Sequence, residues 1–448
     1  MKAQYGPTYD VLIIGAGVSG AALLYMLSKY TNAKVGVIEK YHEPALVNTD
    51  PTQNSQTLHC GDIETNYTLE KAVSVRNASN ILKRYATAQH NADKIIHKMP
   101  KMVIGVGTEE AYKLQKRFEQ FSPYYPNLRL LDRHQINEIE PNVIKGRNDA
   151  ILAMGSTDDY AAVNFEALTH SFINNANHVP FVRQSEHDLM YNEQVEKITR
   201  NDNDEFMVKT DKNRYWARSV VVCAGGHSLK IAHQMGYGLN LSVLPVAGSY
   251  YFTPQVLNGK VYTVQNDKLP FAAIHGDPDV VVPGTTRFGP TAAILPLLER
   301  YNLKTLPEFF EVFRFDKRVA NALWELFGDK DIRNYIIRNA MLDMPLIGRL
   351  MFLQDARKVV PSLKLKDLSF ARKFGGIRPQ LIDKNAQELS MGEAKIDNHD
   401  GIIFNMTPSP GATSCLESAL RDMRSLTEHL KTLTVDEMSL QVELLNGS

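Results

Sequence analysis

Apolar residues at the start of the chain follow first a strand pattern and then a helix pattern. Val11–Ile14 is a short, continuous apolar run, which is typical of a strand buried inside a parallel sheet. Three glycines follow, and the apolar positions continue as a helix expected from about Ser19 to Tyr30. A second apolar run ends at Glu39. Strand, turn, helix and strand in this order predict an α/β unit that binds a nucleotide.

The same stretch has a second interpretation, because Val11–Ser28 carries no charge over 18 residues. That length is near the lower limit for a membrane span or a signal core. However, Asp10 precedes the stretch, glycines interrupt it at the spacing of a dinucleotide-binding turn, and no cleavage-like site follows. We therefore expect a strand and a helix here and not a membrane segment.

Strand patterns return in two later parts of the chain. Gln194–Cys223 reads as three strands, the last of which runs into Ala224-Gly225-Gly226. Near the C-terminus, residues 401–420 read as a strand, a Pro/Gly turn and a helix that begins near Thr413. With the first unit, these segments favour one FAD held by three distant parts of the chain.

The remaining segments predict an inserted region. Residues 81–149 read as mainly helical, and residues 241–364 combine strand-like runs with a helical stretch from Pro307 to Phe352. The expected fold class is α/β, with a Rossmann-type FAD-binding domain of the glutathione-reductase type and an inserted α+β substrate (cap) domain. The expected FAD-binding domain comprises residues 1–80, 150–240 and 365–448, and the expected cap domain comprises residues 81–149 and 241–364.

Composition excludes several other classes of protein. The 448 residues are 44% hydrophobic and 22% charged, as in ordinary globular proteins. Lys plus Arg and Asp plus Glu both total 50, so no basic surplus favours a nucleic-acid partner. Cys60, Cys223 and Cys415 are odd in number and widely spaced, which fits a reducing compartment.

Glycine spacing identifies the expected phosphate-binding turn. Gly15, Gly17 and Gly20 fit G-x-G-x-x-G, which brings backbone N–H groups and a helix N-terminus to a pyrophosphate. Glu39 lies 19 residues beyond Gly20, where an acid accepts hydrogen bonds from ribose hydroxyls. The helix that begins near Thr413 directs its positive end at a reduced flavin. Cofactor-binding residues expected from these segments are Gly15, Gly17, Ser19, Gly20, Glu39, Val195, Ala224, Gly225, Gly411, Ala412 and Thr413.

Several longer strings carry a more specific resemblance. NSQTLHCGDIETNYTLEKA, LPVAGSYYF, KVYTVQNDKLPFAAIHGDPD, TRFGPTA, GGIRPQ and NMTPSPGATSCL together resemble the FAD-dependent malate:quinone oxidoreductases, most of all their shorter, divergent branch. More distantly, the layout resembles the D-amino-acid oxidase and 2-hydroxyglutarate oxidase group, which implies a FAD-binding domain of the D-amino-acid-oxidase type. The resemblance to the malate:quinone oxidoreductases implies oxidation of (S)-malate to oxaloacetate by hydride transfer to flavin N5. It implies that electrons pass to membrane quinone, as in the tricarboxylic acid cycle. It also implies a cytoplasmic protein held peripherally on the inner face of the cytoplasmic membrane.

The polar stretch that begins at Gln53 is expected, from the resemblance and its position, to line the flavin ring. Asn54, Ser55 and Thr57 would offer hydrogen bonds to the ring edges, because unpaired polar atoms are costly in a dry pocket. Gly376 in GGIRPQ is expected beside them. Cys60 is expected to be a small packed residue, so that FAD is bound non-covalently.

Malate oxidation needs a base for the hydroxyl proton and cations for two carboxylates. Arg378 and Arg287 are the candidate carboxylate clamps, because a guanidinium binds a carboxylate bidentately. The alternative is that each is a surface arginine paired with an acid. His275, with Asp277 two residues on, is the first candidate base, and His59 is the second candidate or a flavin neighbour. Either histidine could instead be structural.

The sequence also bears on metal binding, on membrane contact and on alternative functions. Acidic pairs such as Asp158-Asp159 have no ligand-spaced partners, so no metal is expected. Residues 292–313 could contact the membrane or could belong to the core of the cap. Rival functions are a soluble, oxygen-using FAD oxidase of 2-hydroxyglutarate or an amino acid, and a non-catalytic carrier that keeps the FAD fold.

Overall fold

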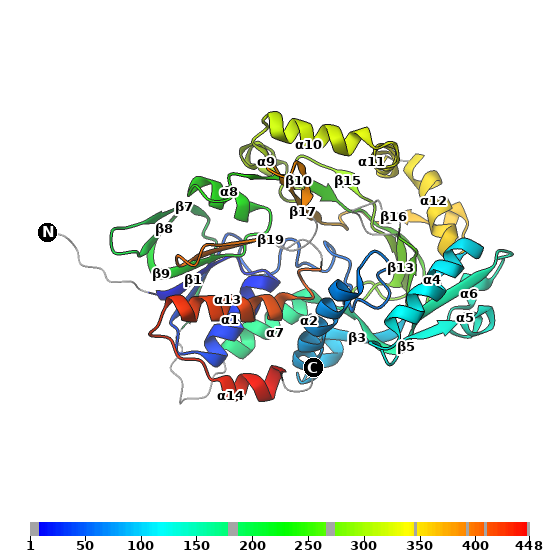
Figure 1. Cartoon of the computed structure of the whole chain (residues 1–448), viewed down its shortest axis with the longest axis horizontal. Coiled ribbons are helices and arrows are strands. Elements are labelled where there is room, and N and C mark those ends of the chain that lie inside the picture. The colour runs from blue at the N-terminus through cyan, green and yellow to red at the C-terminus, as the bar shows by residue number, and fades with distance from the viewer. Residues whose placement is uncertain are drawn as a thin grey trace.

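An eight-stranded sheet forms the half of the molecule that holds both the first and the last elements of the chain (Figure 1). The structure is a computed structural model that describes residues 9–177, 187–265, 274–344, 347–390, 394–406 and 410–445. The strand order is β19-β20-β9-β1-β2-β6, and β7 and β8 extend it as an antiparallel meander from β9. Neighbours among β20, β9, β1, β2 and β6 run parallel. The strands are β1 (Tyr9–Ile14), β2 (Val35–Glu39), β6 (His187–Tyr191), β7 (Val195–Arg200), β8 (Phe206–Thr210), β9 (Arg214–Val222), β19 (Ala394–Asp397) and β20 (Ile402–Met406).

Helices cover one face of this first sheet. Val11 and Ile13 of β1 are fully buried and pack in one apolar cluster with Leu23, Phe172 and Met423 from three helices. The uncharged N-terminal stretch is therefore a strand and a helix, as expected. In the described part of the chain, no helix combines the length and the apolar character needed to cross a membrane. The helices on this side are α1 (Val18–Tyr30), α2 (Leu69–Thr87), α3 (Ala92–Ile95), α7 (Phe165–Asn177), α13 (Cys415–His429) and α14 (Glu437–Leu440), with a π-helical turn at Gln441–Leu445; α8 (His227–Gln234) packs against β20.

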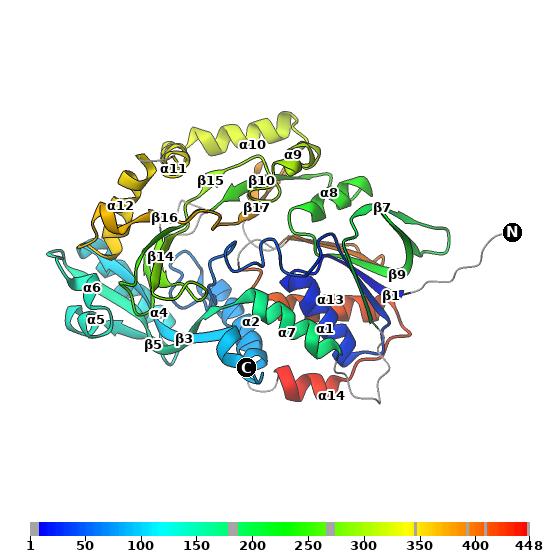
Figure 2. The same ribbon diagram turned by 180° about the vertical axis from the view of Figure 1, so that it is seen from behind.

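A second eight-stranded sheet forms the other half of the molecule (Figure 2). Its order is β16-β11-β14-β13-β12-β3-β5-β4. The expectation of a mainly helical segment at 81–149 was wrong in part, because β3 (Ile96–Val106) crosses the middle of this sheet with the buried run Met102–Ile104. The other elements are α4 (Thr108–Phe121), β4 (Arg129–Leu131), α5 (Arg133–Ile139), α6 (Pro141–Ile144), β5 (Ile151–Val163), β11 (Tyr251–Pro254), β12 (Lys260–Thr263), β13 (His275–Pro278), β14 (Thr285–Gly289), α12 (Ile347–Val359) and β16 (Ser369–Phe370), with a 3₁₀ turn at Leu365–Asp367.

A smaller, four-stranded sheet of order β15-β10-β17-β18 connects the two halves. Val243 and Leu381 on its β10 and β17 pack with Leu12 and Phe404 of the first sheet. Helices α9, α10 and α11 lie along the outer side of this small sheet (Figures 1 and 2). The elements are β10 (Leu241–Ala247), β15 (Ala293–Ile294), α9 (Leu306–Phe313), α10 (Lys317–Gly328), α11 (Lys330–Leu342), β17 (Ile377–Asp383) and β18 (Glu388–Ser390), with a 3₁₀ turn at Leu303–Thr305.

These sheets show how the separated segments of the chain combine. Strand β5 lies in a segment expected in the FAD-binding domain but pairs with β3 in the second sheet. Strand β17 pairs with β10 in the small sheet. The domain boundaries themselves stay a prediction.

Candidate functional site

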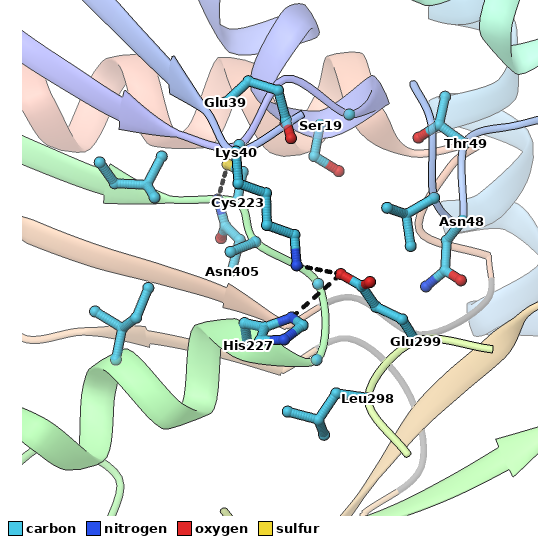
Figure 3. Close-up of a pocket in the computed structure, with 18 of the residues that line it drawn as sticks. Ser19, Glu39, Lys40, Asn48, Thr49, Cys223, His227, Leu298, Glu299 and Asn405 are labelled. Atoms are coloured by element: carbon cyan, nitrogen blue, oxygen red, sulfur yellow. Dashed lines mark hydrogen bonds and ion pairs between the residues drawn. The ribbon is translucent and has the colours of Figure 1, made fainter. Parts of the chain in front are cut away.

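A cavity of about 430 Å³ opens at the carboxyl ends of β1, β2 and β9 (Figure 3). This is the edge of a parallel sheet at which dinucleotides bind. Segments far apart in the sequence line it together, namely the turn after β1, the start of β7, the turn after β9 and residues 411–412. The expected cofactor residues among its lining are Gly15, Gly17, Ser19, Glu39, Val195, Ala224, Gly225, Gly411 and Ala412.

The turn after β1 admits only glycine at two positions. Gly15 has φ +102°, and a Cβ there would lie 2.6 Å from the carbonyl oxygen of Cys223. A Cβ on Gly20 would lie 2.0 Å from the carbonyl oxygen of Gly15, so this glycine permits α1 to pack on the strand. Gly20 therefore shapes the turn, although it is not among the residues lining the cavity.

Side chains fix this turn at the N-terminus of α1. The Glu39 carboxylate accepts hydrogen bonds from the backbone N–H of Ala16 at 2.8 Å and of Tyr41 at 3.0 Å. The Thr49 hydroxyl accepts one from the N–H of Val18 at 3.0 Å. Sequence reasoning missed Thr49, because nothing in its local pattern distinguishes it from other loop threonines. The result is a preformed helix N-terminus that faces the cavity, which is a suitable anion site.

A charged cluster at one wall of this cavity was also missed. The Glu299 carboxylate pairs with the Lys40 ammonium (Figure 3). It also accepts a hydrogen bond from the Tyr41 hydroxyl at 2.6 Å. Next to it, His227 Nε2 lies 3.0 Å from Glu308 Oε2. The cluster joins residues that follow β2 and β9 to the segment that leads into α9. Burial alone would raise the pKa of Glu299, but the charge and hydrogen bond of Lys40 lower it.

A second cavity, of about 250 Å³, adjoins the first. Asn48, Phe165, Pro379, Gly411 and Ala412 line both cavities. The expected residues that line the second cavity are Asn54, Ser55, Thr57, His59, His275, Gly376, Arg378, Gly411, Ala412 and Thr413.

His59 forms a pair with a buried carboxylate in this second cavity. Its Nδ1 lies 2.9 Å from Oε1 of Glu64, and its backbone N–H donates to the Thr413 hydroxyl at 3.1 Å. Burial alone would raise the pKa of Glu64, but the hydrogen bond and charge of His59 and the charge of Lys101 lower it. An ionised carboxylate bonded to one ring nitrogen fixes the orientation of the ring and so sets the direction in which the other nitrogen points. Sequence reasoning had not paired Glu64 with His59.

His275 lies on the opposite strand system, at the start of β13. Its ring stacks on that of Tyr262 with centroids 4.3 Å apart, and the residue is buried. Its Nε2 lies 3.5 Å from Oδ1 of Asp277, beyond the usual length of a hydrogen bond. Asp277 is held more closely by Lys260 Nζ, at 3.0 Å.

Among the residues that the structure describes, two cationic side chains line the second cavity. Arg378 projects from β17, half-buried, and within the described residues its guanidinium has no ion pair. Lys71 lies near the start of α2, with its ammonium 4.5 Å from the centroid of the Tyr67 ring. Lys71 was not expected from the sequence, because one lysine on an amphipathic helix looks like any solvated lysine.

Arg287 has a different environment from Arg378. It is fully buried and is not among the residues lining either cavity. Its guanidinium lies 3.2 Å from Asp277 and 3.4 Å from Asp279. It also donates to the backbone carbonyls of Asn54 and Ser55 at 3.2 and 2.7 Å. It therefore ties the 54–55 loop to the second sheet.

The polar side chains after Gln53 largely form hydrogen bonds to other groups of the protein. The Asn54 amide donates to the carbonyls of residues 48–50, and its oxygen accepts from the N–H of Gln56. Gln56 contacts the Asp279 carboxylate and accepts a hydrogen bond from Val280. Much of this polarity thus shapes the loop and its contact with the second sheet. Cys60 is buried in the core, which raises the pKa of its thiol, and does not line either cavity.

The residues present fit FAD. The glycine turn that a Cβ would fill, the acid at the end of β2 and the two adjoining cavities provide separate places for a diphosphate, a ribose and a ring system. For a metal ion, no group of three or more His, Cys, Asp or Glu side chains is suitably placed in the described ranges.

Comparison with known proteins identifies the family. Residues 7–438 match the malate:quinone oxidoreductase family. This chain belongs to that family. A probable malate:quinone oxidoreductase of Campylobacter jejuni is 47% identical over 435 residues, covering 94% of this chain and 96% of the relative. A malate:quinone oxidoreductase of Helicobacter pylori strain 26695 is 43% identical over 430 residues, covering 94% and 95%.

Solved structures confirm the fold class of this malate:quinone oxidoreductase family member. An FAD-bound L-α-glycerophosphate oxidase of Mycoplasma pneumoniae has a TM-score of 0.64 at 19% identity, with 94% of each chain covered. A glycine oxidase of Geobacillus kaustophilus has a TM-score of 0.64 at 16% identity, with 94% of this chain and 95% of that chain covered. At these identities the likeness is evidence of the fold alone.

Proposed function

We propose that this protein oxidises malate to oxaloacetate in the second cavity, with FAD held across both cavities and quinone as electron acceptor. The activity and the cofactor are those of its family. The observation that carries the assignment of the site is the continuity of the two cavities, since the second brings two cations and a histidine–carboxylate pair to the end of the first. FAD, when bound, accepts the hydride from C2 of malate.

The first cavity would hold the nucleotide half of FAD. The N-terminus of α1 and the Gly15–Gly17 turn would bind the diphosphate, and Glu39 would bind the ribose hydroxyls. Residues 411–413 line the passage toward the second cavity, just before α13 begins at Cys415. Their place at a helix N-terminus suits the flavin edge that becomes negative on reduction.

Arg378 and Lys71 would bind the two carboxylates of malate. A guanidinium binds a carboxylate through two parallel hydrogen bonds, whereas an ammonium acts as a point charge. Arg378 would therefore set the orientation of the substrate. Arg287, expected from the sequence as a second clamp, is engaged by two buried carboxylates, and we assign it instead to holding the 54–55 loop in position.

His59 would take the proton from the malate hydroxyl. Glu64 would orient the ring through Nδ1 and stabilise the positive charge that the ring gains on accepting the proton. His275, the first candidate from the sequence, would form the wall of the cavity with Tyr262.

Anaerobic titration of the purified yellow protein with a panel of 2-hydroxy acids and amino acids tests this function. Malate is expected to bleach the flavin absorbance, with electrons then recovered by added quinone. If malate leaves the flavin oxidised while 2-hydroxyglutarate or an amino acid bleaches it, the protein is the rival FAD oxidase. A purified protein that contains no flavin would instead support the carrier hypothesis.

A further inference from the structure

Large apolar side chains are exposed mainly along one edge of the molecule. Of the 17 large hydrophobic residues that are exposed in the described chain, 11 lie between residues 301 and 350. This segment contains α9, α10, α11 and the start of α12, which follow one another along the upper edge in Figure 1 and remain there in Figure 2. We call the 11 residues the α9–α12 face: Tyr301, Leu303, Leu306, Phe310, Phe315, Trp324, Ile337, Met341, Met344, Ile347 and Leu350.

Two helices show why this exposure is unusual. In α10, Val319 and Ala322 face the core, yet Trp324 on the outer side is 81% exposed. In α11, Ile336 and Leu342 face inward, whereas Ile337 is 55% exposed and Met341 lies one turn further along the same outer side. An ordinary surface helix carries polar residues on its outer face. Clustered exposure of this kind marks a binding surface.

Charged side chains on this segment favour an anionic partner. Among residues 301–350, six basic side chains are exposed, namely Lys304, Arg314, Lys317, Arg318, Lys330 and Arg333. Among the described residues of this segment, three acidic residues are exposed, and one of them, Glu311, pairs with Lys230. Asp316, whose side chain is 37% exposed, pairs with Arg318, so the basic surplus lies mainly in the other five side chains. Apolar side chains surrounded by lysine and arginine are typical of elements that lie on an anionic bilayer.

The α9–α12 face lies close to the second cavity. The inner side of α11 packs on the cavity wall, where Tyr335 contacts Val246 and Ala292. The side-chain oxygen of Asn339 accepts a hydrogen bond from the N–H of Ala292 at 2.8 Å. At α11, one helix, about 10 Å across, thus separates the exposed Ile337 and Met341 from the wall of the cavity. A surface that rests on a membrane here would bring the site near a lipid-soluble acceptor.

We propose that the α9–α12 face is the surface that docks on the membrane, with its apolar side chains among the acyl chains and its basic side chains at anionic headgroups. The proposal rests on the proposed function, since quinone is dissolved in the bilayer. From the sequence, residues 292–313 were a candidate either for contact with the membrane or for the core of the cap, and the α9–α12 face replaces them as the candidate membrane contact. Leu297 and Leu298 are buried, and Leu298 lines the first cavity, so these two leucines belong to the core.

Sedimentation with lipid vesicles tests the proposal. The test variant is Trp324→Asp combined with Ile337→Asp, neither of which touches the cavities. The matched control is Met438→Asp combined with Val442→Asp, because these residues are also exposed but lie at the opposite edge of the molecule, on and beside α14 (Figure 1). Vesicles contain phosphatidylglycerol and phosphatidylethanolamine, and malate-dependent reduction of a soluble dye is measured in parallel.

The wild-type protein and the control are expected to sediment with the vesicles. The test variant is expected to bind at least about tenfold more weakly, while it reduces the dye at the wild-type rate. Weaker wild-type binding to vesicles of phosphatidylcholine alone is also expected, and equal binding would contradict the role of the basic side chains. A second test variant, Leu303→Asp with Phe310→Asp, replaces the first if that one fails to fold.

Several results would overturn the proposal. Wild-type protein that stays in solution, a test variant that sediments fully, or a control that loses binding equally would each do so. So would a wild-type dimer, formed without lipid, that the test variant dissociates, because the face would then be a subunit interface. Vesicle binding that is intact in a protein unable to reduce the dye with malate would refute the proposed function and leave the docking surface standing.

Discussion

In the second cavity, Nδ1 of His59 lies 2.9 Å from Oε1 of the buried carboxylate of Glu64. The Nε2 of His275, by contrast, lies 3.5 Å from Oδ1 of Asp277, and the other oxygen of this carboxylate, Oδ2, contacts Lys260 and Arg287. Of these two distances to carboxylates of described residues, that of His59 is the shorter. The close pair of His59 with the buried Glu64 is the reason to place the proton transfer at His59.

Replacing His59 with Asn should slow the reduction of the flavin by malate about 10²–10⁴-fold, because general base catalysis contributes that much. Glu64→Gln should cause a smaller loss in kcat with KM close to wild type, since it removes orientation and not substrate binding. Anaerobic stopped-flow absorbance measures both rates. His134→Asn, an exposed histidine, is the control. A His275→Asn enzyme that loses the rate while His59→Asn keeps it would reverse the assignment.

Arg378→Met should raise KM for malate about 10–100-fold, as expected when charge-assisted hydrogen bonds to a carboxylate are lost. Arg378→Lys should recover only part of the affinity, because an ammonium does not bind the carboxylate bidentately. The melting temperature should be unchanged, since the guanidinium has no ion pair with any described residue to lose. Arg372→Met, at an exposed arginine six residues earlier, is the matched control. An unchanged KM in Arg378→Met would show that the clamp lies elsewhere.

Arg287→Met should lower the stability of the protein more than its activity. The substitution leaves Asp277 and Asp279 buried without their shared cation, and breaking a buried ion pair in this way costs about 3–5 kcal/mol. Denaturant unfolding measures the loss, with Arg372→Met again as the comparison. A stable Arg287→Met protein whose KM for malate is strongly raised would instead support the clamp role expected from the sequence.

Glu308 should contribute to stability in a pH-dependent way. The hydrogen bond of His227 is the main cause that lowers the pKa of Glu308 from 4.5 to about 2. A lowered pKa stabilises the fold fully above about 4.5, and that contribution disappears as the pH falls toward 2. Because the side chain is partly exposed, the effect should not exceed about 3 kcal/mol.

Urea unfolding of wild type and Glu308→Gln at several pH values checks this dependence. The variant should be less stable near pH 6, and the two free energies of unfolding should approach each other as the pH falls from about 4.5 toward 2. A stability difference that stays constant over this range would show that the carboxylate charge is not responsible.

The sequence alone determined those features that depend on residues close together in the chain. Apolar periodicity and glycine spacing predicted a strand at Val11–Ile14, a glycine turn and a helix from about Ser19, and the structure has the strand at Tyr9–Ile14 and α1 from Val18. The positions of Gly15 and Gly20, where a Cβ would clash, give the physical reason for the spacing. The longer strings indicated the family. A mainly helical 81–149 was wrong in part because a strand such as β3 is defined by its partners β12 and β5, which lie far away in the chain.

Only the tertiary structure decided which charged groups meet. Lys71 and Arg378 line one cavity although they come from α2 and β17. Glu299 pairs with Lys40, which lies more than 250 residues earlier in the chain. Arg287 contacts two aspartates and a loop that is distant in the sequence. Sequence spacing predicts which side chains lie together within one helix turn or one strand. Which distant side chains form an ion pair depends on how the sheets and helices pack. Burial makes an unpaired charge costly, so the fold brings a partner to each buried charge.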